Sequence, residues 1–253
     1  MFRTSFLAAL TLLAASPTLP AAEPPARSYA AIEQVGWTYG DEAYPGGTTR
    51  LVRFTHDGGT SSLGESEATR IVGELAAASL ARPGEAVAFT LARQAGSLAC
   101  TGRVESRGRA AGTCRFDPDQ GFAAELGRRG IVPEDSDEMM ALALVGARLD
   151  MVDGLQGLGY RFGDAGDLVA VAALGVTPAF AGELRDAGLA LDDLDNLVAA
   201  RAIGLDAGWL GEMARAGYPD LTIDQAIQMR AVGITPDYAR RMSRVLSALG
   251  EIQ

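Results

Sequence analysis

A 29-residue period runs through the second half of the chain. The spacing is kept by a column of aromatic or methionine residues, a column of leucine or methionine residues, and two columns of glycine. The four columns are Phe122, Met151, Phe180, Trp209 and Tyr238; Leu126, Leu155, Leu184, Met213 and Met242; glycines 130, 159, 188 and 217; and glycines 146, 175, 204 and 233. Such a period is typical of stacked supersecondary units that bury their faces against their neighbours. It predicts an α-solenoid-like array of 29-residue repeats over residues 119–253.

Each repeat is expected to form two short helices. In the clearest repeat, Thr177 is a predicted N-cap, Pro178 stands at the first helical position, and Gly188 supplies the left-handed residue that ends the helix. The expected apolar stripe of this helix is Phe180, Leu184 and Ala187. A helix over 235–249, which carries several arginines, is predicted to close the array as a polar end cap.

The second helices share a column of predicted caps. Its members are Asp135, Asp164, Asp193 and Thr222. Thr222 with Gln225 forms a capping box. The acidic runs around these positions resemble calcium loops, but they lack the glycine and glutamate spacing of an EF-hand. Their recurrence at helix starts favours caps over a calcium site.

Residues 34–118 are predicted to form a small β-rich module with one helix. The expected elements are strands over 35–39, 50–55 and 87–91, a turn over 41–47, a helix over 66–80, and a hairpin that pairs 97–104 with 110–116 around Arg107. Together with the helical repeats, these elements predict the α+β class, with the β-rich module first.

The predicted hairpin places Cys100 directly opposite Cys114. Opposed Cβ atoms of an antiparallel pair lie about 4.5–5.5 Å apart and a disulfide needs about 3.5–4.5 Å, so a modest adjustment suffices. A disulfide is expected because the chain carries an export signal, and two free thiols used as small core residues are the alternative. The pair lacks C-x-x-C spacing, which argues against redox catalysis.

The first residues predict export. Residues 1–22 hold one positive charge, a short apolar run and small residues before the expected cleavage site, which is the layout of a secretory signal. A retained membrane anchor is the alternative, although the apolar run is shorter than the roughly 20 residues that cross a bilayer. Residues 23–33 are expected to be a linker. No later stretch predicts a transmembrane segment, so we expect a periplasmic or secreted protein.

Composition excludes several kinds of chemistry. All 22 basic residues are arginine and the formal net charge is −10, so Schiff-base and P-loop lysine chemistry are absent and nucleic acid is disfavoured as a partner. His56 is the only histidine, which excludes zinc sites that need two imidazoles. No cofactor or metal is therefore expected.

Two segments resemble a known family. The pattern Gly-Val-Thr-Pro-Ala-Phe-x-x-x-Leu-Arg-x-x-Gly-Leu at 175–189, with Leu-Val-x-x-Arg-x-x-Gly at 197–204, is similar to the tandem repeats that accompany BlaR-type sensor metallopeptidases. The residues around 89–118 resemble the β-segment that precedes those repeats. The family usually has aromatic residues where this chain has Cys100 and Cys114, and the peptidase motif H-E-x-x-H is absent here. The resemblance implies an extracytoplasmic repeat module over about residues 86–250, without catalytic residues.

The favoured function is a non-catalytic module that binds another protein outside the cytoplasm, because repeat arrays present extended surfaces. A regulatory or ligand-sensing component of cell-envelope signalling is the alternative that the resemblance suggests. A hydrolase that uses His56, Asp57 and either Ser61 or Ser62 is a further alternative, without a nucleophile-elbow motif to support it.

Arg201 and Arg230 are the candidate binding residues. They occupy one column of the second helices and could receive carboxylates of a partner protein. The alternative is that they bridge to acidic residues of the neighbouring repeat. The sequence does not specify an oligomeric state.

Overall fold

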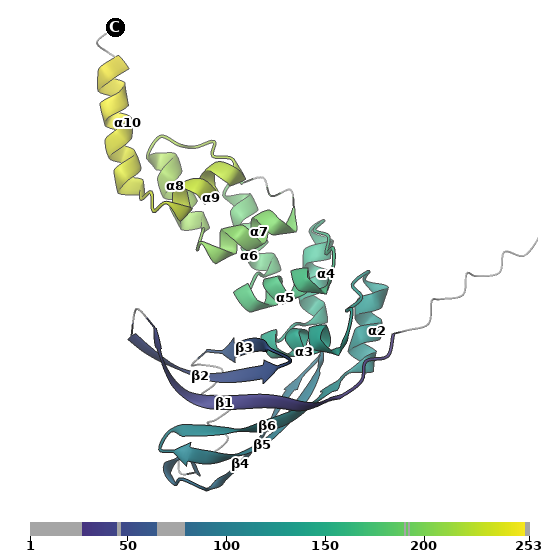
Figure 1. The fold of residues 1–253 in the computed structure, drawn as a ribbon. Helices are drawn as coiled ribbons and strands as arrows, with labels where there is room; N and C mark the ends of the chain where they lie inside the picture. Colours follow the sequence, from purple (N-terminus) through teal and green to yellow (C-terminus); the bar gives the residue numbers. More distant parts are fainter. Residues whose placement is uncertain (1–26, 45–46, 65–78, 190, 192, 251–253) are drawn as a thin grey trace, which may run out of the picture.

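The computed structural model describes residues 27–44, 47–64, 79–189, 191 and 193–250. An antiparallel sheet is followed by a series of helices, so the α+β class is confirmed (Figure 1). The predicted signal sequence and nearly all of the helix expected over 66–80 lie outside the described residues. The end of that segment forms a short 3₁₀ helix, η1 (Ser79–Ala81).

Six strands form one sheet in the order β3-β2-β1-β6-β5-β4. They are β1 (Ile32–Tyr44), β2 (Gly47–His56), β3 (Gly59–Leu63), β4 (Ala86–Arg93), β5 (Gly96–Ser106) and β6 (Arg109–Pro118). The predicted strands are confirmed, but the turn expected over 41–47 is wrong. The β1–β2 ladder continues from Asp41↔Arg50 to Tyr44↔Gly47, so both strands are longer than predicted.

The β5–β6 hairpin has the predicted register. Leu98 lies opposite Phe116, and Cys100 lies opposite Cys114. The two cysteines form a disulfide with their Cα atoms 3.9 Å apart. On the next pair of the same face, a Cβ on Gly112 would stand 2.0 Å from the Thr101 carbonyl oxygen. Only glycine fits where the two strands approach so closely.

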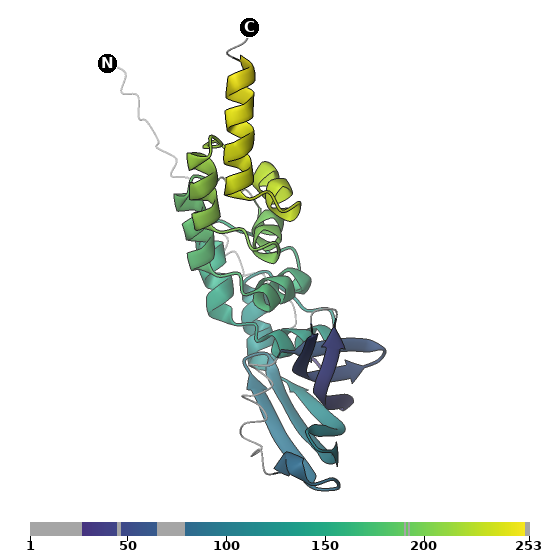
Figure 2. The same cartoon turned by 90° about the vertical axis from the view of Figure 1, so that its left-hand side faces the viewer.

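The helices after the sheet alternate between two rows. One row contains α2 (Gln120–Arg128), α4 (Leu149–Gly157), α6 (Pro178–Asp186), α8 (Ala207–Arg215) and α10 (Pro236–Gly250); the other contains α3 (Ser136–Val145), α5 (Ala165–Leu174), α7 (Leu194–Ala202) and α9 (Ile223–Ala231). Each helix contacts the next one in its own row, and α3 also packs on the sheet. The rows run away from the sheet, and α10 lies at the far end (Figures 1 and 2).

The helix ends follow the predicted capping chemistry. Thr177 accepts a hydrogen bond from the Phe180 N–H, and Thr222 forms the expected capping box with Gln225. The aspartates at 135, 164 and 193 also accept hydrogen bonds from the first turns of their helices. Side chains thus satisfy backbone donors that would otherwise have no partner inside the helix.

The glycine columns end the helices in the left-handed conformation. At Gly188, φ is +90°, and the N–H of Leu189 donates to the Leu184 carbonyl at 3.1 Å. The same Schellman bond recurs after glycines 130, 159 and 217. The expectation that Ala187 belongs to the apolar stripe is wrong. The helix ends at Asp186, so Ala187 is the C-cap residue and is exposed.

The sheet and the first helices share one core. Phe116 and Leu98 of the hairpin belong to the same cluster of buried side chains as Leu126 of α2 and Met139 of α3. The later helices bury a second cluster around Leu184, Leu197 and Met213.

Among the described residues, no single helix has the length and apolar character to cross a membrane. Helices α5 and α6 reach that length and composition only as a pair, with a bend of 75° between them.

Replacing Gly188 by valine is expected to lower the melting temperature far more than Asp186→Ala does. A β-branched residue at φ +90° carries backbone strain on the order of 1–3 kcal/mol, whereas Asp186 is exposed. Differential scanning fluorimetry of the two variants measures the difference, and equal melting temperatures would contradict the proposed role of this glycine.

Candidate protein-binding groove

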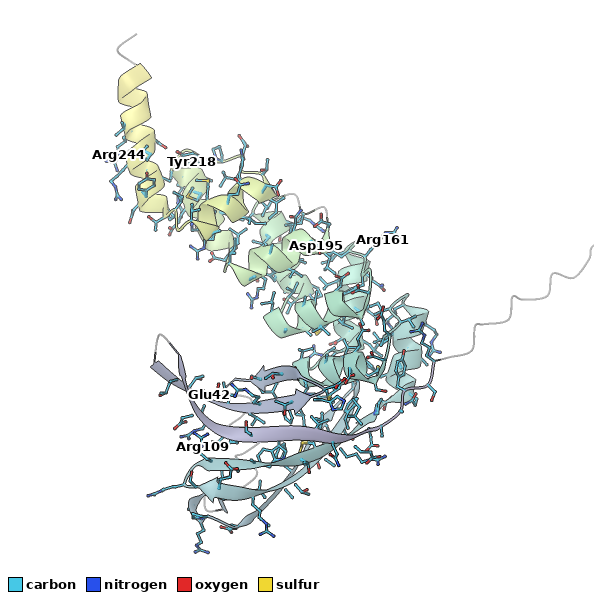
Figure 3. All side chains as sticks on the ribbon, viewed as in Figure 1. Glu42, Arg109, Arg161, Asp195, Tyr218 and Arg244 are labelled. Atoms are coloured by element: carbon cyan, nitrogen blue, oxygen red, sulfur yellow. A yellow bond between two sulfur atoms is a disulfide. The ribbon has the colours of Figure 1, made fainter. Side chains whose placement is uncertain are left out.

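An apolar groove lies where the C-terminal end of α9 meets α10, and we refer to it as the terminal groove. Its lining residues are Tyr218, Gln228, Met229, Val232, Ile234, Tyr238, Ala239 and Met242. The volume is about 480 Å³, and none of the lining side chains is charged. Tyr218 enters from the segment that follows α8 and lies close to α10 (Figure 3).

Large apolar side chains of the terminal groove are open to solvent. Val232 is 75% exposed, Tyr238 45% and Met242 38%. Val245 extends the exposed stripe along α10, because residues 238, 242 and 245 have the spacing of one helix face. Grouped apolar exposure of this kind marks an interaction surface more often than isolated exposed residues do. Helix α10 therefore carries an apolar stripe in addition to its arginines.

The same columns are buried in the preceding repeats. Trp209 and Phe180, which stand 29 and 58 residues before Tyr238, are 5% and 7% exposed. Met213 and Leu184, the counterparts of Met242, are fully buried. The terminal groove is thus an interior surface of the helical rows that no described helix covers.

Arg201 of α7 and Arg230 of α9 help to cover the aromatic rings that correspond to Tyr238 in the two preceding repeats. The guanidinium carbon of Arg230 lies 5.8 Å from the ring centroid of Trp209, and its nitrogens donate to the Gly204 carbonyl at 3.1 and 3.2 Å. Arg201 repeats this arrangement 5.1 Å from the Phe180 ring and donates to the Leu174 carbonyl at 3.1 Å.

Both arginines thus reach the preceding repeat. There they contact backbone carbonyls and aromatic rings, and not the acidic residues that the alternative prediction named. In the described part of the chain, neither Arg201 nor Arg230 forms a salt bridge with a carboxylate, so the acidic bridging expected as the alternative is not what holds them. Binding of a partner's carboxylates at these residues stays a prediction.

A second hollow of about 300 Å³ lies between the β2–β3 hairpin and α3. His56, Asp57 and Ser61, which the hydrolase alternative names, all line it. Ser62 is not among the lining residues. Successive residues of a strand point to opposite faces, so Ser62, which pairs with Arg53, lies on the other face of β3 from Ser61.

Both ring nitrogens of His56 face other groups. Nδ1 lies 3.1 Å from the Gln34 carbonyl oxygen, and Nε2 lies 3.4 Å from Oδ1 of Asp137 on α3. Among the described residues, no hydrogen bond joins His56 to Ser61, whereas a nucleophile needs such a link to its base. The imidazole instead connects β1 and the end of β2 to α3.

Charge pairing outside the groove also links neighbouring helices. Arg129, directly after α2, holds Asp153 of α4 with an Nε–Oδ1 distance of 2.6 Å, and the hydrogen bond from this guanidinium lowers the pKa of the Asp153 carboxyl. Within the described ranges, no group of three or more histidine, cysteine, aspartate or glutamate side chains is arranged to hold a metal ion.

No protein-family model, curated protein or solved structure matches this chain.

Proposed function

We propose that the protein is a non-catalytic extracytoplasmic module that binds another protein through the terminal groove. The observation that carries this proposal is the contrast within one column: Tyr238 is 45% exposed, whereas its counterparts Trp209 and Phe180 are buried. Burial of exposed apolar area on association is favourable by roughly 25 cal/mol per Å². A neutral apolar groove at the end of the chain of helices suits a protein surface better than a charged or nucleic-acid ligand.

Three further features support this proposal. The two helical rows and their capping residues recur with a step of 29 residues, which supports the interpretation as an α-solenoid-like array with an extended surface. The Cys100–Cys114 disulfide is compatible with an oxidising compartment. The layout of residues 1–22 adds the expectation of export to the periplasm or the medium.

Site-specific photo-crosslinking in the producing cell tests this function. A benzophenone amino acid at Gln228, which lines the groove, is expected to give one discrete adduct, to be identified by mass spectrometry. The same probe at the exposed Asp186 on α6 serves as the control and should give no such adduct. The adduct should persist with His56→Ala, because the proposed role does not use the imidazole.

The groove variant Val232→Lys is expected to abolish the adduct, since an ammonium group would be buried against apolar atoms without a partner. Val232 is 75% exposed, so this substitution leaves the fold intact. Persistence of the adduct in the Val232→Lys variant, or its loss in a folded His56→Ala variant, would contradict the proposal.

A further inference from the structure

We propose that the partner enters the terminal groove as an amphipathic helix with apolar residues at its first and fourth positions and an arginine at its eighth. This inference rests on the proposed function and specifies the chemistry of the partner. Its basis is internal, because α7 and α9, whose arginines lie over Phe180 and Trp209 of the preceding repeats, match that description.

Two of the inner occupants, α7 and α9, share one pattern, whereas α5 has Ala172 where they have arginine. Helix α7 buries Leu194 and Leu197 and places Arg201 seven residues after the first of them. Helix α9 has the same spacing with Ile223, Ala226 and Arg230. The two apolar residues lie on one helix face, and the arginine follows one turn after the second, so a helix of about three turns presents all three.

The arginine of this pattern makes two contacts that the terminal groove leaves open. Arg230 stacks on Trp209 and donates to Gly204. The counterparts one repeat later are the Tyr238 ring and the carbonyl of Gly233. In the described part of the chain, no guanidinium stacks on Tyr238 and no side chain donates to that carbonyl.

These open groups favour a guanidinium. The C-terminal end of α9 carries the negative end of its helix dipole, which attracts a cation. A planar guanidinium can donate to the carbonyl while it lies over an aromatic face, whereas an ammonium group is compact and strongly hydrated. Since the groove lining is uncharged, the arginine and the apolar face both find complementary surfaces.

In the described part of the chain, no helix lies in this groove. Helices α2, α4, α6 and α8, which precede α10 in its row, are followed by glycines 130, 159, 188 and 217. The next position in that column is Leu246. Helix α10 therefore runs for 15 residues instead of 9 and continues past the point where the others turn back. Figure 2 shows α10 extending beyond the other helices.

Among the described helices of a second copy, none is both free and of the required kind. Helices α7 and α9, which carry the pattern, already bury their apolar residues inside the array. The exposed apolar stripe of a second copy would be that of α10, which runs through Tyr238, Met242 and Val245. Helix α10 has arginines, but none of Arg240, Arg241 and Arg244 follows two apolar residues of the same helix at distances of seven and four, so we assign the groove to a helix of a different protein.

A peptide that copies α9 tests the inference on the full-length protein. The probe is a fluorescent synthetic peptide with the sequence of residues 220–234, stapled through positions 224 and 228, because an isolated helix of this length is marginal in water. Fluorescence anisotropy should show saturable binding to the protein and none to the Val232→Lys variant, in which an ammonium group beside the carbonyl of Gly233 would repel the arginine. A peptide with Arg230→Ala should bind about tenfold more weakly, which corresponds to one cation–π contact and one hydrogen bond.

The matched protein variant is Tyr238→Ala. Because it removes the ring on which the arginine is proposed to stack, the two peptides should differ less in their affinity for Tyr238→Ala than for the original protein. The variant Asp186→Ala should bind both peptides as the original protein does.

Equal binding of the two peptides to the original protein, or no binding at all, would overturn the inference. A dimer in sedimentation analysis that Val232→Lys dissociates would overturn it in favour of a second copy. If peptide binding fails while the Gln228 adduct to another protein persists, only the chemistry assigned to the partner falls. If the probe at Gln228 also gives no adduct, the proposed function is overturned.

Discussion

The double substitution Cys100→Ala and Cys114→Ala is expected to lower the free energy of unfolding by about 3 kcal/mol. The disulfide closes a loop with a sequence separation of 14, and the loss of loop-closure entropy in the unfolded chain predicts a stabilisation of this size. Both side chains are buried in the core, on the face that β5 and β6 turn toward it. Urea denaturation followed by circular dichroism measures the change.

The neighbouring pair on the opposite face of the hairpin provides a matched control. Thr101 and Thr113 lie opposite each other on the same two strands and are exposed. Replacing both by alanine should cost less than about 1 kcal/mol, because only exposed cross-strand contacts are lost. In native protein, non-reducing mass spectrometry should give a mass two hydrogens below the reduced form. Two alkylatable thiols would refute the disulfide.

The hairpin could be predicted because one register satisfies every opposed pair at once. Leu98 with Phe116 and Cys100 with Cys114 share one face, and a shift by one residue would expose them all. Strand β3 gave no such signal, since Thr60, Ser61 and Ser62 lack apolar alternation. It forms because Asp57 and Gly58 both adopt positive φ in a tight turn that returns the chain along β2.

The helix ends could be predicted for a different reason. Capping is local chemistry, so each aspartate or threonine before a helix and each glycine after one has the same consequence in every repeat. Exposure is not local. Trp209 and Tyr238 occupy one column of the sequence, yet whether a ring is buried depends on whether the following helix packs over it, as α9 does over Trp209.

The candidate site was therefore only partly accessible from the sequence. The sequence identified Arg201 and Arg230 as a pair, but not that their guanidinium groups lie on Phe180 and Trp209. It also identified an end helix with arginines, but it did not predict the groove. The sign that α10 would run on and leave a groove uncovered was the absence of a glycine at position 246.

Replacing Trp209 by alanine is expected to cost roughly 3–5 kcal/mol, the usual loss for a large buried aromatic residue. Its ring is 5% exposed, lies beneath Arg230 and donates from Nε1 to the Ile234 carbonyl at 3.2 Å. Tyr238→Ala, in the same column, should cost about 1 kcal/mol, because its ring is half exposed and removes less apolar area from water. Urea titrations of both variants by far-ultraviolet circular dichroism measure this contrast.

Trp209→Phe separates packing from hydrogen bonding in this comparison. It keeps an aromatic ring under Arg230 but leaves the Ile234 carbonyl without the indole donor, so its loss should be roughly 1–2 kcal/mol and fall between the other two. Equal losses for Trp209→Ala and Tyr238→Ala would mean that Tyr238 is already covered in the free protein. Since the terminal groove exists only if Tyr238 lacks the cover that Trp209 has, this result would remove the basis for a partner helix without any binding measurement.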